Sequence, residues 1–134
     1  MTFVSSQNDP FYALLSKSLQ ELRGALSISL TDRRGDIIAK VIAGHGDGVP
    51  SDEELSVMHV YGQLTYQQAP TRLSELAVER GSRRWQAKRL IVDDDLYDLW
   101  LVCHTDVSYA ATSVEMSNKL SDIEAQLISL LRGQ

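Results

Sequence analysis

The segment LYDLWLVCHT, residues 96–105, is apolar at positions that would face both sides of a β-sheet. Because successive side chains of a strand point to opposite faces, a half-exposed strand alternates between apolar and polar residues, and a strand covered on both faces does not. The four large apolar residues at 99–102 could not be hidden together on an edge strand. The sequence therefore predicts that this strand is central in its sheet.

Residues 25–41 show the pattern of a β-hairpin. Small residues alternate with larger apolar ones before the turn sequence Asp32-Arg33-Arg34-Gly35, and IIAKV follows it. The glycine of this turn supplies the positive φ that tight turns often need. We expect the inward-facing residues to be Leu26, Ile28 and Leu30 on the first strand, and Ile37, Ala39 and Val41 or their neighbours on the second.

The same turn contains Arg34-Gly35-Asp36, the tripeptide that cell-surface adhesion receptors bind when it is exposed on a loop. Residues 1–10 lack the charged start and apolar run of a signal peptide, so we expect the protein to stay in the cytoplasm. The single cysteine, Cys103, cannot form an internal disulfide, and nothing indicates a secreted, cross-linked scaffold. We therefore interpret the tripeptide as a hairpin turn and not as an adhesion ligand.

Helical periodicity begins after residue 9 and returns at the carboxyl end. Asp9-Pro10 predicts an N-cap followed by proline at the first helical position, and Gly24 lies where a left-handed residue is expected after the helix. Apolar residues at spacings of three and four indicate that both helices are amphipathic. They are Phe11, Leu14, Leu15, Leu19 and Leu22, joined by Ser18, in the first helix, and Met116, Leu120, Ile123, Leu127 and Leu130 or Leu131 in the last.

Another helix is predicted from about Asp52 to Ala69, before Pro70, and Ser51 with Glu54 forms its capping box. At 100° per residue its polar residues occupy only about a quarter of the circumference, and we expect this strip to face solvent. One apolar side should lie on the sheet and the other in an interface. The strip is Ser56, His59, Gln63 and Gln67; one side is Leu55, Met58, Gly62, Tyr66 and Ala69, and the other is Val57, Val60, Tyr61 and Leu64.

Residues 73–105 predict about three strands. Residues 73–81 fit a strand or a last helical turn, residues 83–92 fit a strand, and Asp93-Asp94-Asp95 predicts a turn. The charged residues of the strand at 83–92 indicate that it lies at an edge of the sheet and is protected there by charge. Its charged residues are Arg83, Arg84, Lys88 and Arg89.

Together these elements predict an α/β protein, an α+β sandwich whose central antiparallel sheet of about five strands is flanked by helices in the order α-β-β-α-β-β-β-α. We expect one domain over residues 1–134, with residues 1–8 as a flexible leader, because 134 residues that are 43% hydrophobic suffice for one core. The net charge of -5 and a pI near 5.1 argue against a nucleic-acid partner. No apolar run is long enough for direct membrane insertion.

Few residues could support catalysis. Cys103 and His104 are neighbours on a strand, so their side chains should point to opposite faces. His45 and Asp47 offer two metal ligands, fewer than the three or four of a zinc site. The aspartates at 93–95 have no phosphate-binding motif beside them. We predict no enzymatic activity, no catalytic residue, no metal site and no cofactor.

The basic residues around Trp85 could contact RNA or a protein, and the acidic triplet that follows them favours a protein. The predicted partner interface therefore combines the outer side of the helix at 52–69, together with Tyr66, and part of this basic cluster. Its residues are Val57, Val60, Tyr61, Leu64, Tyr66, Arg84, Trp85 and Lys88.

The order of elements and the segment LSKSLQELRGALSISLTDRRGDIIAKV, residues 15–41, resemble the roadblock family of dynein light chains and GTPase-associated scaffolds. In that family a helix ends at a short junction, a strand runs into Asp-x-x-Gly, and a second strand follows. Residues 99–131 are similar to the family's last strand, small-residue bend and terminal helix, whereas residues 71–88 depart from its usual third and fourth strands. The matching positions are Arg23-Gly24-Ala25, Asp32, Gly35 and Ile37-Ile38-Ala39.

Within the family, residues 11–36 are most similar to the late endosomal adaptors that scaffold MAP kinase and Rag GTPase signalling in the Ragulator complex. The resemblance implies a dimer with another roadblock-fold protein, in which second helices pack together and edge strands join two sheets. It implies a small GTPase as a further partner and a place at the late endosome or lysosome surface through a partner. It supplies no catalytic residues, since members hold GTPases, motors or kinases in place, and some bacterial relatives assist a partner GTPase without supplying a side chain.

Two other classes fit the same outline. A small-molecule sensor domain of profilin-like or PAS-like type shares the central sheet flanked by helices, and it would require a sizeable pocket between sheet and helix. A secretion chaperone would also be small, acidic and dimeric. The sequence leaves open whether a roadblock dimer forms with an identical or a different chain, and which GTPase it binds.

Overall fold

The computed structural model describes residues 9–43, 48–68 and 74–133. Within these ranges the elements follow the predicted order, α-β-β-α-β-β-β-α. The leader at 1–8, the candidate ligands His45 and Asp47, and the helix end at Ala69 lie outside the described residues. The elements are α1 (Pro10–Gln20), β1 (Ala25–Thr31), β2 (Ile37–Ile42), α2 (Asp52–Gln68), β3 (Glu75–Arg80), β4 (Arg83–Val92), β5 (Asp95–His104) and α3 (Ser113–Arg132).

The strands form one antiparallel sheet in the order β2-β1-β5-β4-β3. β5 lies in the middle, which confirms the prediction drawn from its apolar residues. β4 pairs with β5 on one side and β3 on the other, so the prediction that it is a charged edge strand was wrong. Its charged side chains are accommodated because each has an acidic partner that compensates for lost hydration. The pairs are Arg83–Glu54, Arg84–Glu79, Lys88–Glu124 and Arg89–Asp98.

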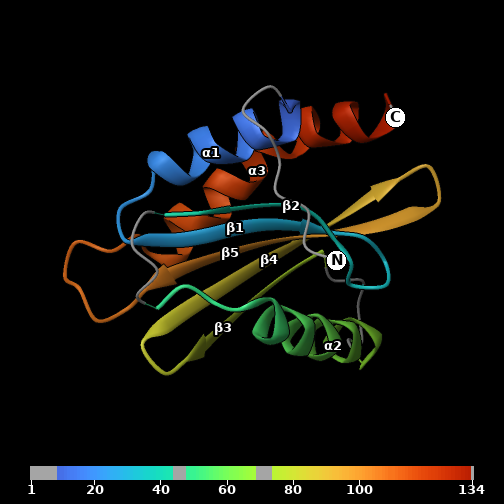
Figure 1. Ribbon diagram of the computed structural model, residues 1–134. Coiled ribbons are helices and arrows are strands. Elements are labelled where there is room, and N and C mark those ends of the chain that lie inside the picture. Colours follow the sequence, from blue (N-terminus) through green and yellow to red (C-terminus); the bar gives the residue numbers. More distant parts are fainter. Residues whose placement is uncertain (1–8, 44–47, 69–73, 134) are drawn as a thin grey trace.

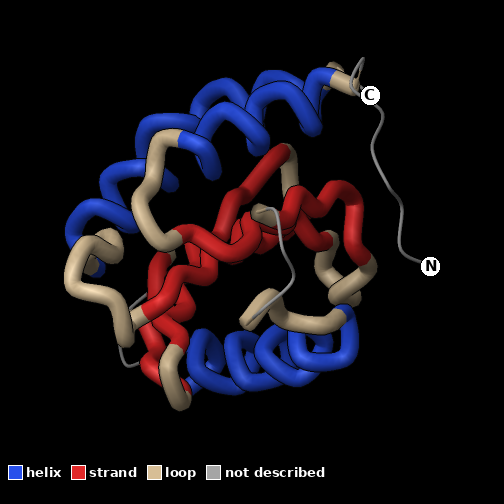
Figure 2. The backbone as a smooth tube through the Cα atoms, turned by 60° about the vertical axis from the view of Figure 1, so that its left-hand side comes forward, coloured by secondary structure: helices blue, strands red, loops and turns tan. Residues whose placement is uncertain are grey.

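Helices cover both faces of the sheet. Figure 1 shows α1 and α3 on one face and α2 on the other, and the turned view in Figure 2 shows the same three layers. Trp85 and Trp100 lie on the α2 side, where their rings make a T-shaped contact with centroids 6.0 Å apart. The buried core on this side consists of Leu26, Leu55, Met58, Leu76, Trp85, Ala87, Trp100 and Val102.

The β1–β2 hairpin forms where it was predicted, but its six inward residues divide between the two faces. Leu26 and Ile37 pack on the α2 side. The strand register shifts close to each of them, and such an irregularity moves the side chains beyond it to the other face. The residues that pack under α1 and α3, as one inward face, are Ile28, Leu30, Ala39 and Val41.

The local signals at helix and strand ends are confirmed. Asp9 Oδ1 accepts a backbone N–H of the first turn of α1 at 2.8 Å. Ser51 and Glu54 exchange side-chain to backbone hydrogen bonds, both 3.1 Å long, ahead of α2. Asp93 and Asp94 have φ values of 51° and 48° and make the β4–β5 turn. These contacts fix where α2 begins and how β5 returns beside β4.

Candidate interaction site

α2 presents exposed apolar side chains on the side away from the sheet. They recur at spacings of three and four residues, so they lie on one face of the helix. Contiguous exposed apolar groups of this kind mark interaction sites on soluble proteins. We call these residues the α2 outer face; they are Val57, Val60, Tyr61 and Leu64, with exposed fractions of 52%, 58%, 46% and 53%.

The opposite side of α2 packs on the sheet through Leu55, Met58 and Gly62. A Cβ atom on Gly62 would lie 3.2 Å from Cζ2 of Trp100, so the glycine lets the helix approach the indole closely. One of the two apolar sides of α2 therefore covers the sheet, as predicted, and the other is left exposed.

The polar strip of α2 faces solvent only in part. Ser56 and Gln67 are exposed as predicted, whereas His59 and Gln63 are turned toward charged groups on the sheet. His59 is buried, with Nε2 3.1 Å from the carbonyl oxygen of Arg33 and Nδ1 3.6 Å from Oδ2 of Asp98. Gln63 Nε2 donates to the same carboxylate oxygen at 3.2 Å. Arg89 donates to both oxygens of Asp98, from Nε at 3.1 Å and from Nη2 at 3.3 Å. We call these four side chains, His59, Gln63, Arg89 and Asp98, the Asp98 cluster.

Tyr66 extends this cluster. It was predicted in the partner interface but is partly buried, and the guanidinium carbon of Arg89 lies 4.0 Å from the centre of its ring. Burial, reinforced by the nearby Asp98 carboxylate, raises the pKa of the Tyr66 phenol. Tyr66 therefore helps to hold α2 on β4 and belongs to the sheet-facing side of the helix.

The β1–β2 turn is tied to α2 through a glycine. Gly35 has a φ of +88°, and a Cβ atom at this position would lie 2.8 Å from Cδ2 of His59. Asp32 Oδ1 accepts the backbone N–H groups of Arg34 and Asp36 at 2.9 and 3.0 Å. Arg34-Gly35-Asp36 is thus the hairpin turn that the sequence predicted, and its glycine packs against a buried histidine.

The alternation of β4 separates three residues that were predicted to share the partner interface. Trp85 is 1% exposed and lies in the core beneath α2, so it does not reach the surface. Arg84 and Lys88 are on the other face of the sheet, where they contact Ala111 and Glu124 near α3. Of the eight predicted interface residues, only the four of the α2 outer face form one exposed surface.

A strand edge lies beside α2. Among the described residues β3 pairs with β4 alone, and it is the outer strand on its side of the sheet. The guanidinium of Arg80 on β3 reaches Sδ of Met58 on α2, with a nitrogen to sulfur distance of 3.6 Å. Figure 1 shows β3 and α2 together at one side of the molecule. Sequence reasoning left this strand open because residues 73–81 fit either a strand or a last helical turn.

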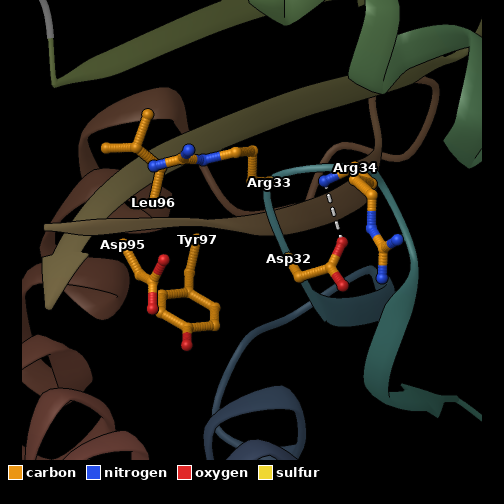
Figure 3. A pocket seen from close by; sticks show the side chains of 6 residues that line it. All are labelled: Asp32, Arg33, Arg34, Asp95, Leu96 and Tyr97. Carbon is orange, nitrogen blue, oxygen red and sulfur yellow. Dashed lines mark hydrogen bonds between the residues drawn. The ribbon is translucent and has the colours of Figure 1, made fainter.

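The sensor-domain alternative requires a pocket between sheet and helix. A hollow of about 300 Å³ lies between the β1–β2 and β4–β5 turns, with Arg33, Arg34 and Tyr97 on its walls (Figure 3). Arg33 is engaged there, since Nη2 donates to the carbonyl of Asp94 at 3.0 Å. Two further hollows of about 280 and 550 Å³ adjoin α1. None of these three is lined by α2, and of the three the hollow of about 280 Å³ lies between a helix and the sheet, at α1 and β2.

The described residues offer little to catalysis. Cys103 is buried under α1 and α3, where burial raises the pKa of its thiol to about 12. His104 is partly exposed beside Asp106, at 3.5 Å from Nδ1 to Oδ1. Within the described ranges, no three histidine, cysteine, aspartate or glutamate side chains gather where they could hold a metal ion. No helix among them has the length and apolar character to cross a membrane.

Comparison with solved structures places this geometry in a known class. The fold matches the gliding protein MglB from Thermus thermophilus with a TM-score of 0.74 at 17% identity, covering 91% of this chain and 88% of that one. It matches the Roadblock/LC7 domain from Streptomyces avermitilis with a TM-score of 0.58 at 14% identity, covering 87% and 96%. It also matches an MglB with a tetrameric arrangement, with a TM-score of 0.61 at 17% identity, covering 85% and 87%.

No protein-family model matches the sequence, and no curated protein is significantly similar to it. The likeness therefore lies in the fold. The chain has the roadblock fold, which confirms the fold that the resemblance of residues 15–41 and 99–131 implied.

Proposed function

We propose that this chain is a non-enzymatic, dimeric scaffold or adaptor of roadblock type. The observation that carries the proposal is the α2 outer face, which is about half exposed at each of its four residues. Full burial of a side chain of this size contributes about 1.5–3 kcal/mol relative to exposure, so covering the remaining area of all four would contribute roughly 3–6 kcal/mol. This amount is a substantial part of the binding free energy of a stable protein–protein interface.

The partner we propose for this face is another roadblock-fold protein, identical or different. Among the described residues the outer edge of β3 is unpaired and it lies next to α2, so one partner could cover the outer face and extend the sheet. The tetrameric MglB is an example of assembly by a protein of similar fold. The family resemblance adds a small GTPase as a cytoplasmic partner of the assembled dimer. A Ragulator-type adaptor at the late endosome or lysosome surface is the finer form of the same proposal.

The test is the solution mass of the purified chain, 14.9 kDa as a monomer, by light scattering over a dilution series. We expect a dimer, and we expect Tyr61→Glu/Leu64→Glu to be monomeric with unchanged circular dichroism, because two buried charges would oppose association. The matched control is Tyr109→Glu/Val114→Glu, which makes the same kind of change at residues 58% and 69% exposed away from α2. This control should remain dimeric.

A wild-type chain that is monomeric at every concentration would exclude the homodimer. The heterodimer would then be tested by capturing partners with the purified chain. A roadblock-fold protein should be captured by the wild-type chain and by the control, and it should not be captured by Tyr61→Glu/Leu64→Glu. If the double variant unfolds, the outer face is part of the core and the proposal fails.

A further inference from the structure

The other edge of the sheet is also open. β2 is the outer strand beyond β1, and among the described residues it pairs with β1 alone (Figure 1). The backbone N–H of Ala43 donates to the carbonyl of Leu26 at 2.9 Å, so these two residues face each other as a hydrogen-bonded pair. In an antiparallel ladder such pairs alternate with pairs whose N–H and C=O groups point away. The register therefore turns the backbone groups of Lys40 and Ile42 outward, toward the open edge.

This edge has little of the usual protection against strand pairing over residues 40–42, because the register irregularity between β1 and β2 lies at the other end of β2, opposite Leu30 and Thr31. Edge strands are commonly guarded by an outward lysine, a proline or a bulge. Lys40 is the charged residue of β2, but its Nζ lies 2.9 Å from Oδ1 of Asp52 and 3.1 Å from the carbonyl of Pro50, and its side chain is 13% exposed. Ile42 is 48% exposed. Among the described residues, the outer strand thus presents unpaired outward backbone groups and an apolar side chain, with no exposed charge of its own.

A hollow of about 280 Å³ runs beside the same end of the strand. It lies between α1 and β2, and the described residues that line it include no aspartate, glutamate, lysine, arginine or histidine. A strand laid along β2 would direct alternate side chains toward this hollow, as in recognition by strand addition. The lining residues are Tyr12, Ser16, Leu19, Gln20, Val41, Ile42 and Ala43.

We propose that the β2 edge binds an extended segment of a partner protein, which adds a strand to the sheet and places an uncharged, apolar side chain in the α1–β2 hollow. An extended occupant follows from the outward backbone groups of Lys40 and Ile42, which only another strand can pair in register. The apolar side chain follows from the lining of the hollow.

A foreign segment fits better than a second copy of this chain. If β3 joins one copy, as the proposed function has it, a second pairing of copies through β2 would continue the sheet without closing it, and such contacts lead to fibres. A foreign strand instead caps the sheet. Only this choice of occupant rests on the proposed function; the open edge and the hollow do not.

The probe is a phage-displayed library of random 12-residue peptides, selected on the full chain. We expect enrichment of peptides with alternating apolar residues, and slower amide hydrogen exchange at Lys40 and Ile42 when a synthetic peptide of the enriched sequence is added. Ile42→Pro removes an outward N–H without touching the β1–β2 ladder, and Ser16→Phe fills the hollow. Each should weaken peptide binding at least about fivefold, the factor that one net hydrogen bond supplies. Ile42→Ala keeps the N–H and should bind more tightly than Ile42→Pro.

Other outcomes overturn the proposal in distinct ways. If no peptide is enriched, or if the selected peptides bind Ile42→Pro and Ser16→Phe as tightly as the wild type, this edge does not bind a strand. Protected amides in the free chain would mean that the edge is already occupied. Loss of that protection on dilution would identify a second copy, and loss on deletion of residues 1–8 would identify the chain's own amino terminus. Peptide binding should persist in Tyr61→Glu/Leu64→Glu, so failure of the dimer and failure of this site are separable.

Discussion

Removing the Asp98 carboxylate should destabilise the protein strongly. The side chain is 4% exposed, and it accepts two hydrogen bonds from Arg89 and one from Gln63. Asp98→Ala would leave the Arg89 guanidinium, on a side chain 12% exposed, without its acidic partner. Breaking a buried pair by removing one member costs about 3–5 kcal/mol, because an uncompensated charge stays buried. That is a large part of the roughly 5–15 kcal/mol by which domains are stable.

The assay is urea unfolding followed by the fluorescence of Trp85 and Trp100, which lie in contact beneath α2. We expect the free energy of unfolding to fall by about 3–5 kcal/mol in Asp98→Ala. Arg89→Met/Asp98→Leu should regain much of the loss, since replacing both charges with apolar groups removes the unpaired ion. A loss below about 1 kcal/mol in Asp98→Ala, the range of exposed ion pairs, would refute the reasoning.

Two further changes test the turn and the α2 amino end. Gly35→Ala should lower the free energy of unfolding by about 1–2 kcal/mol for its positive φ, and by a further amount for the clash with His59. When the same change is made in a His59→Ala protein, the clash should be absent and only the loss due to φ should remain. Equal losses with and without His59 would contradict the contact. The hydrogen bond from Arg83 lowers the pKa of Glu54, so this carboxylate adds stability above its unfolded value of 4.5 that is lost as the pH falls through the folded value. The melting temperatures of the wild type and Glu54→Gln should therefore differ at neutral pH and converge in acid, and a difference independent of pH would count against the pair.

The fold was largely predictable from local patterns. The capping residues Asp9 and Ser51, the turn at Gly35 and the unbroken apolar run around Trp100 each act over a few residues, and each has the structure that its chemistry favours. The two apolar sides of α2 could be read from its periodicity for the same reason. Where register irregularities intervene, as beside Leu26, alternation no longer gives the face of a side chain.

The errors concern residues whose surroundings are set by distant segments. His59 looked like a solvent-facing residue because nothing near it in sequence reveals that Asp98 and Arg89 come to lie beneath it. The strand at 83–92 looked like an edge because its arginines and lysine were seen without their acidic partners. Trp85 was placed in an interface with its basic neighbours, although adjacent residues of a strand face opposite ways. Sequence patterns could not show which distant residues would supply the acidic partners of the strand at 83–92.

The Asp98 cluster has a consequence for recognition. Packed leucines allow a helix to roll or slide by small steps, because dispersion contacts have little directionality. Hydrogen bonds and ion pairs require defined angles, and those that join α2 to the sheet would break if the helix turned about its axis. The four apolar side chains of the α2 outer face are therefore held in one orientation before the proposed association. Less ordering is left to occur on association, and a rigidly presented surface discriminates more sharply between a well-matched partner and one that would need the helix to adjust.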